Sequence, residues 1–138
     1  MVKYMKQIKR KLSSPTVKSN ASKLHASVYA FCKQRFPLYT IIQEMPIYGD
    51  NRGLKSHLFI DIFVKELGIA IECNGEQHYN PNPFFFGGSY GFKKAQENDK
   101  LKKEWCKENG YKLVIFRFDE KLDYDKFNGK INDALRGG

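Results

Sequence analysis

The pattern of apolar and polar positions along the chain predicts seven secondary-structure elements after residue 20. We expect a helix where apolar residues recur every three or four positions, and a strand where they alternate or form a short run. In chain order these elements are a helix at 21–35, strands at 39–47, 57–65 and 69–74, a helix at 92–109, a strand at 111–118 and a helix at 124–135. The order α-β-β-β-α-β-α predicts an α/β fold, a single domain with a mixed β-sheet of about four strands flanked by helices.

Charge divides the chain into two parts. Nine of the 24 lysines and arginines precede Glu44, the first acidic residue, and the remaining 15 are balanced by 15 acidic residues. We therefore predict a basic N-terminal arm at residues 1–20, containing Lys9, Arg10 and Lys11, followed by a domain at 21–138. The whole net charge of +9 lies in the first third of the chain, which favours a polyanionic partner such as nucleic acid. The alternative is a basic tail that only aids solubility.

The cysteines and the lengths of the apolar runs bear on the cellular compartment in which the protein is expected. Three dispersed cysteines, Cys32, Cys73 and Cys106, form no CxxC pair, which favours a reducing environment over a disulfide framework or a zinc ribbon. No apolar run approaches the roughly 18 residues of a membrane-spanning helix. We expect a cytoplasmic protein with no membrane partner, and the sequence leaves its oligomeric state open.

Two carboxylates occupy strands that are otherwise apolar. Asp61 shares its predicted strand face with Phe59 and Phe63, and Glu72 lies in the next strand. A two- or four-residue turn between these strands would place Asp61 directly opposite Glu72, with Cβ atoms roughly 4.5–5.5 Å apart; a three-residue turn would offset them. Facing carboxylates repel unless a cation neutralises them, and Mg²⁺, or Mn²⁺ in its place, suits such a pair. The alternatives are that one acid pairs with a lysine or faces solvent.

A histidine and a third acid extend this candidate site. His78 follows the third strand closely, where it could transfer a proton near neutral pH, or be structural or exposed. Asp99 lies on a partly apolar face of the 92–109 helix, which we expect to meet the sheet. That face consists of Phe92, Ala95, Gln96, Asp99, Lys103 and Cys106. An inward aspartate needs a partner, which is either His78 or a salt bridge to Lys102 or Lys103.

The element order and three segments resemble the PD-(D/E)XK nuclease superfamily. The segments are FIDIFV, IAIECNGEQH and FKKAQENDKLKKEWCKENGYKLVIF, and the resemblance covers roughly residues 20–120. The branch it favours contains the very short patch repair endonucleases and the phage and homing endonucleases with an EDxHD-type site. The resemblance implies a restriction-endonuclease-like fold and a Mg²⁺-dependent endonuclease that hydrolyses DNA phosphodiesters with metal-activated water.

The resemblance also implies roles for individual residues. Asp61 and Glu72 correspond to the metal-binding acids, His78 to the catalytic histidine and Asp99 to the helix aspartate that supports it. The Cys73 carbonyl is a further candidate metal ligand. Two departures from the family pattern are visible in the sequence. They are Asn74 in place of the usual lysine, which requires another residue to stabilise the developing charge, and His25 at about the place of a glutamate on the first helix.

Further residues are candidates for ordering water or contacting nucleic acid. Gln77, like Asn74, falls beside the carboxylates, where it could order water or touch phosphate. The loop at 81–92 is rich in phenylalanine and glycine; it either folds back over the core or presents Tyr90 to bases. Lys93 and Lys94 are candidate contacts to the phosphate backbone.

The sequence therefore predicts a nuclease acting on DNA, with double-stranded DNA as the expected substrate and several alternatives open. One alternative is a catalytically weak or inactive nucleic-acid-binding module of the same fold. Another is a nuclease acting on RNA or branched DNA, and a third is an interaction protein whose basic arm binds a different acidic partner. The resemblance also suggests a phage or mobile-element origin.

Overall fold

The computed structural model describes residues 20–47, 58–74 and 89–137. Its elements are α1 (Asn20–Arg35), β1 (Ile41–Ile47), β2 (Leu58–Val64), the short 3-10 helix η1 (Lys65–Leu67), β3 (Ile69–Asn74), α2 (Ser89–Asn109), β4 (Lys112–Arg117) and α3 (Tyr124–Gly137). The predicted α-β-β-β-α-β-α order is confirmed, because η1 belongs to the turn between the second and third strands.

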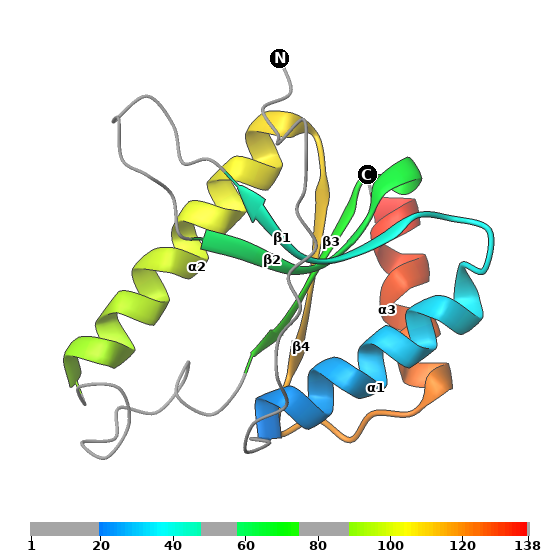
Figure 1. Cartoon of the computed structure of the whole chain (residues 1–138), viewed down its shortest axis with the longest axis horizontal. Coiled ribbons are helices and arrows are strands. Elements are labelled where there is room, and N and C mark those ends of the chain that lie inside the picture. Colours follow the sequence, from blue (N-terminus) through cyan, green and yellow to red (C-terminus); the bar gives the residue numbers. More distant parts are fainter. Residues whose placement is uncertain (1–19, 48–57, 75–88, 138) are drawn as a thin grey trace.

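The strands form one four-stranded sheet in the order β1-β2-β3-β4 (Figure 1). Strand β2 is antiparallel to both of its neighbours, β1 and β3. Strands β3 and β4 are parallel and are joined through α2. A parallel pair needs such a crossover connection, whereas antiparallel neighbours need only a short turn. The predicted mixed sheet flanked by helices is therefore confirmed.

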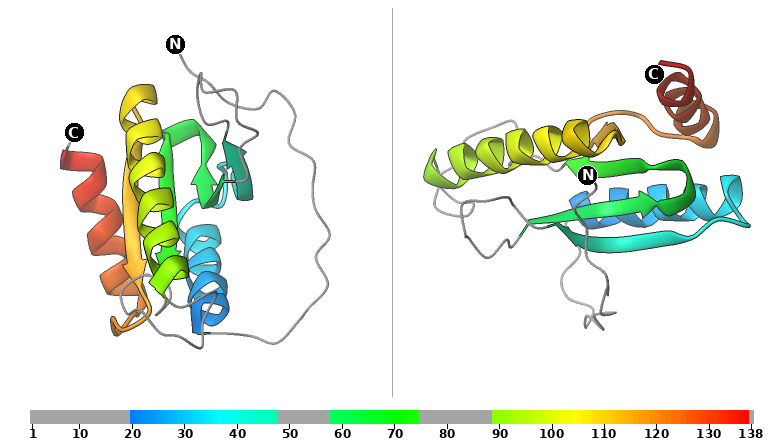
Figure 2. Two further views of the ribbon diagram at one scale, coloured as in Figure 1. Left: turned by 90° about the vertical axis from the view of Figure 1, so that its left-hand side faces the viewer. Right: turned by 90° about the horizontal axis from the view of Figure 1, so that it is seen from above.

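Helices cover both faces of the sheet (Figure 2). Helices α1 and α3 pack on one face, where Val28 and Phe127 join a cluster with β-strand residues such as Ile71. Helix α2 packs on the other face, where Trp105 contacts a second cluster that includes Ala70. All six residues of β3 are buried, as expected for a strand covered on both faces. Within the described ranges, no helix is long and apolar enough to cross a membrane.

In both β1 and β2, the regular alternation of side chains between the two faces of the sheet is broken at one position. Ile60 packs in the α2-side cluster, whereas Ile62 packs on the side of α1 and α3. In a regular strand, residues two apart lie on the same face, so the alternation is broken at Asp61. Glu44, which the β1–β2 register places opposite Asp61, has a φ of 52°, in the left-handed region that non-glycine residues rarely adopt.

The break corrects one expectation from the sequence. Strict alternation predicts that Phe59, Asp61 and Phe63 share a face, but Phe63 is 4% exposed and Phe59 is 44% exposed. The period of two holds only for a strand without an irregular residue. The face exchange at Asp61 therefore turns Phe59 toward solvent.

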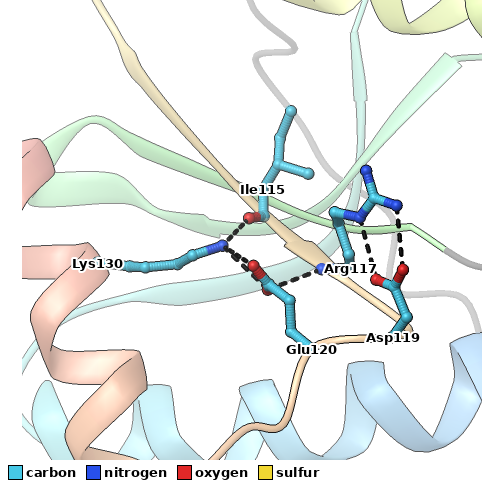
Figure 3. A network of polar contacts seen from close by, with 5 residues as sticks. All are labelled: Ile115, Arg117, Asp119, Glu120 and Lys130. Atoms are coloured by element: carbon cyan, nitrogen blue, oxygen red, sulfur yellow. Dashed lines mark hydrogen bonds and ion pairs between the residues drawn. The ribbon is translucent and has the colours of Figure 1, made fainter.

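The outer edge of β4 is closed by side chains that follow it in sequence (Figure 3). Lys130 of α3 donates to the carbonyl oxygen of Ile115 and also pairs with Glu120. Glu120 accepts a hydrogen bond from the Arg117 backbone N–H, and the Arg117 side chain pairs with Asp119. Unpaired backbone groups on an edge strand invite pairing with other chains, so this network blocks part of that edge.

Candidate active site

The turn between β2 and β3 sets the register of the two carboxylate-bearing strands. Residues 65–68 connect the strands, and Gly68 has a φ of 64°. The ladder pairs Ile62 with Ile71 and Val64 with Ile69. These pairs are the ones predicted for a four-residue turn. The next step along the same register brings Asp61 and Glu72 together.

Asp61 and Glu72 bridge the place where the regular pairing of β2 and β3 ends. The Asp61 backbone N–H donates to Glu72 Oε2 at 2.9 Å, and the Cys73 backbone N–H donates to Asp61 Oδ2 at 2.8 Å. The carboxylates thus accept hydrogen bonds from each other's strands beyond the last ladder pair, Ile62 with Ile71. The predicted closeness of the two acids is confirmed, and each is held by a backbone donor.

A lysine from helix α2 completes the arrangement. Lys102 places its Nζ 2.8 Å from Glu72 Oε1. The side chains of Lys102 and Glu72 are 13% and 5% exposed, so the ion pair is largely removed from water. The alternative in which one acid pairs with a lysine is therefore realised for Glu72, although the sequence did not indicate which lysine this would be.

The orientation of α2 explains why Lys102 reaches the sheet. The predicted inward face includes Gln96 and Lys103, but both are exposed, and Trp105 is buried instead. Apart from Leu101, the described side chains of α2 that are at least partly buried form a stripe at helical spacing, namely Ala95, Asn98, Asp99, Lys102, Trp105, Cys106 and Asn109. Lys102 lies at the centre of this stripe. The three-residue spacing between Lys102 and Trp105 is the feature of the sequence that could have predicted that Lys102 faces the sheet. The apolar residues used for the prediction indicated a neighbouring face of the helix instead.

Burial and charge act in opposite directions on the ion pair. Burial, followed by the neighbouring Asp61 carboxylate, raises the pKa of Glu72 to about 7, although Lys102 works against this. Burial also disfavours the charged form of Lys102, but Glu72, Asp61 and Asp99 together raise its pKa. Lys102 therefore remains protonated, and its single positive charge faces more than one carboxylate.

Asp99 is half-buried on the same face of α2 as Lys102. Its charge contributes to the field at Lys102, while the ammonium group of Lys102 is hydrogen-bonded to Glu72. The structure therefore places Asp99 beside the site. The predicted support of His78 by Asp99 stays a prediction, because residue 78 lies outside the described ranges.

Cys73 and Asn74 lie directly after Glu72 at the end of β3. The Cys73 thiol is buried in the cluster with α1 and α3, and burial, followed by Asp61 and Glu72, raises its pKa. Asn74 is 3% exposed, and its carbonyl oxygen accepts the Phe118 N–H at 2.9 Å. The predicted metal contact through the Cys73 carbonyl stays a prediction.

His25 of α1 contacts strand β1 at the position paired with Ile62. Its Nε2 lies 2.9 Å from Gln43 Oε1 on β1. This contact anchors α1 to the strand just before Glu44, the residue with positive φ. We therefore assign His25 a contact between helix and strand in the described structure.

Several predicted site residues fall outside the described ranges. Gln77 and His78 are among them, as are the arm residues Lys9, Arg10 and Lys11. The loop at 81–88 is also outside, and so are the side chains of Tyr90 and Lys94. Lys93 is exposed near the start of α2. The roles predicted for these residues stay predictions.

The donor set at Asp61 and Glu72 is chemically suited to a hard cation. Mg²⁺ in proteins is commonly held by one or two carboxylates, with water and phosphate oxygens completing its shell. Each carboxylate oxygen has more than one acceptor position, so an existing hydrogen bond leaves room for a metal. Across the residues that the structure describes, no group of three or more His, Cys, Asp and Glu side chains is arranged to hold a metal ion. Asp61 and Glu72 alone would therefore supply only part of the shell of a bound cation.

Part of the chain is similar to two viral proteins. It is 38% identical over 77 residues to uncharacterized protein 033L of Invertebrate iridescent virus 3, covering 56% of this chain and 37% of that protein. It is 34% identical over 69 residues to uncharacterized protein 307L of Invertebrate iridescent virus 6, covering 50% and 34%. The chain thus spans about a third of the length of the curated relatives it matches. No protein-family model matches the chain, and no solved structure matches it.

Proposed function

We propose that this protein is a metal-dependent endonuclease of the PD-(D/E)XK type that hydrolyses phosphodiester bonds in double-stranded DNA. The observation that carries the proposal is the placement of Asp61 and Glu72 against each other at the point where β2 and β3 separate. Among the described residues, Lys102 pairs with Glu72 alone, so the two adjacent carboxylates keep a residual negative charge that a divalent cation would offset.

The residues of the chain would divide the chemistry as follows. Asp61 and Glu72 would hold Mg²⁺ or Mn²⁺, which when bound polarises a phosphoryl oxygen and acidifies water. Water would give up a proton to His78 as its oxygen bonds to phosphorus, the bond from phosphorus to the leaving sugar oxygen would break, and that oxygen would take up a proton from solvent. We assign the removal of the water proton to His78, supported by Asp99. The backbone donors at Asp61 and Cys73 fix the carboxylates before substrate arrives.

The excess positive charge suits the proposed substrate. Lys9, Arg10 and Lys11 in the arm, together with Lys93 and Lys94 at the start of α2, would contact phosphates without reading sequence. Tyr90 would stack on or wedge between bases. These contacts would orient a duplex over the end of the sheet that carries Asp61.

The proposal is tested with supercoiled plasmid in Mg²⁺, Mn²⁺ or EDTA. We expect the wild-type protein to nick or linearise the plasmid only with metal, and we expect Asp61→Asn and His78→Ala each to slow cleavage by about 100-fold or more. The matched control is Asp133→Asn, which removes an exposed carboxylate of α3 that pairs with Arg136. This variant should cleave as wild type does.

Two outcomes would contradict the proposal. One is cleavage that survives EDTA or the Asp61→Asn substitution, which points to a contaminating nuclease or a different site. The other is the absence of cleavage of plasmid, branched DNA and RNA with either metal. A preference for branched DNA or RNA over duplex would keep the nuclease and change its substrate.

A second candidate function is a nucleic-acid-binding module without catalysis. It is favoured by the ion pair between Lys102 and Glu72, which already neutralises one carboxylate without metal, and by the uncharged Asn74 at the end of β3. Such a module would bind DNA with the same affinity in EDTA and in Mg²⁺. A metal requirement for binding or cleavage excludes it.

A further inference from the structure

The strand position beside Glu72 offers no positive charge to a substrate. Asn74 is uncharged and 3% exposed, and its backbone carbonyl is occupied by the Phe118 N–H. Negative charge develops on phosphate oxygens during phosphodiester hydrolysis, and fixed cationic donors stabilise it. If the protein is a nuclease, this charge must come from another element.

Lys102 lies in the packed face of α2, where burial makes a charged side chain energetically unfavourable. It occupies the middle of the packed stripe of α2, three residues before the buried Trp105. Lysine is rarely buried without a partner. A buried ion pair commonly adds no more stability than well-packed apolar residues of similar volume. The pairing of Lys102 with Glu72 is therefore poorly explained by stability alone.

The ammonium group of Lys102 lies directly against the candidate carboxylates. Its Nζ is 2.8 Å from Glu72 Oε1, and the Lys102 side chain is 13% exposed. An ammonium group has three N–H donors and no acceptor. One hydrogen bond to Glu72 leaves donors for an oxygen atom of a ligand beside the carboxylates. A cationic donor of this kind suits contact with a phosphate oxygen.

We propose that Lys102 is the phosphate-contacting cation of this site, delivering from helix α2 the positive charge that strand position 74 lacks. This inference rests on the proposed function for the identity of the phosphate, a DNA phosphodiester held at Asp61 and Glu72. In the absence of substrate, the same ammonium group neutralises Glu72. Lys102 thereby has one partner in the free protein and a second in the complex.

The role is tested by measuring DNA binding separately from cleavage. Binding of a short duplex is measured in Ca²⁺, and single-turnover cleavage in Mg²⁺, for wild type, Lys102→Met and Lys102→Arg. We expect Lys102→Met to bind DNA about tenfold more weakly, as for a lost charge-assisted hydrogen bond. We expect its cleavage to fall by about 100-fold or more. Lys102→Arg keeps the charge and should recover most of the binding and part of the rate.

Two controls separate a phosphate contact from a structural role. Lys126→Met removes one exposed charge from α3, across the sheet from α2, and should leave duplex affinity and cleavage within about threefold of wild type. Because Lys102→Met leaves Glu72 without its partner and could unfold the protein, the binding assay is repeated with Glu72→Gln alone and combined with Lys102→Met. Thermal unfolding reports whether each variant is folded.

The outcomes distinguish this inference from the proposed function. Lys102→Met is compared in two backgrounds, the wild-type protein and Glu72→Gln. If the substitution leaves duplex affinity unchanged in either one, the role of Lys102 is overturned, whether or not the wild type cleaves DNA. Weaker binding that Lys102→Arg restores, in a protein that never cleaves, would keep the phosphate contact and reject the nuclease. Weaker binding together with slower cleavage is the result expected if both are right.

Discussion

At the scale of single residues, the surroundings of Glu72 oppose its negative charge. Its side chain is buried, the Asp61 carboxylate lies beside it, and Lys102 is the cation paired with it. Burial and the Asp61 charge raise its pKa from 4.5 to about 7. Since the folded chain holds this proton more tightly than the unfolded chain, Glu72 links folding to pH.

We predict that Glu72 makes the protein less stable as pH rises. With a folded pKa of about 7 above the ordinary 4.5, its protonation favours folding fully below pH 4.5, and this contribution is lost as pH rises through 7. A shift of this size corresponds to on the order of 3 kcal/mol. Urea unfolding at pH 5 and pH 8 should show a larger loss for wild type than for Glu72→Gln. Equal losses in the two proteins would contradict the prediction.

Among the elements, the turn at 65–68 has the most direct effect on the site. Gly68 donates its N–H to Val64 O, and its carbonyl accepts the Lys112 N–H, so it ties the β2–β3 turn to the start of β4. The turn length also fixes which residue of β3 faces Asp61, because a slip of one residue would move every side chain to the other face. The geometry of this connection therefore determines whether the carboxylates meet.

We predict that Gly68→Ala destabilises the fold more than Gly110→Ala does. Both glycines have positive φ, 64° and 74°, so alanine at either position costs about 1–2 kcal/mol in backbone strain. A Cβ at Gly68 would also lie 3.0 Å from the Tyr111 ring, whereas a Cβ at Gly110 would meet nothing within 4 Å. Urea unfolding of both variants measures the difference. Equal destabilisation would show that the Tyr111 ring moves aside without cost.

In the whole molecule, the charge and the candidate site are carried by different parts of the chain. The sheet and its helices hold Asp61, Glu72 and Lys102 in place, whereas the net charge of +9 lies in residues 1–43. Electrostatic attraction to DNA depends mainly on the number of phosphates neutralised. Most of the salt-dependent attraction to DNA and the chemistry should therefore respond to separate changes, with Lys102 as the residue that contributes to both.

We predict that deleting residues 1–18 weakens the salt dependence of DNA binding. The deletion removes six of the nine basic residues that precede Glu44. The slope of log affinity against log salt should fall by up to about five, since each phosphate contact contributes about 0.9. Fluorescence anisotropy with a labelled duplex over a salt series measures this slope. Asp61→Asn is the control and should keep the wild-type slope; an unchanged slope after deletion would place the DNA contacts elsewhere.

Local patterns in the amino-acid sequence were sufficient to predict the order of the elements and, on condition of a two- or four-residue turn, the meeting of the two acids. Helical and strand periodicities are local properties, and the register of β2 and β3 follows from a four-residue turn that the chain marks with Gly68. For this reason the closeness of Asp61 and Glu72 follows from residue spacing and turn length.

Packing between distant elements was needed to show which cation reaches Glu72 and where the strands exchange faces. Lys102 is 30 residues from Glu72, and its direction toward the sheet depends on how α2 packs through Trp105, a residue outside the face that periodicity predicted to meet the sheet. The positive φ of Glu44 opposite Asp61 has no signal in the residue type, because glutamate normally avoids that conformation. Both features depend on contacts between segments far apart in the chain, and the spacing of residues within one segment does not specify such contacts.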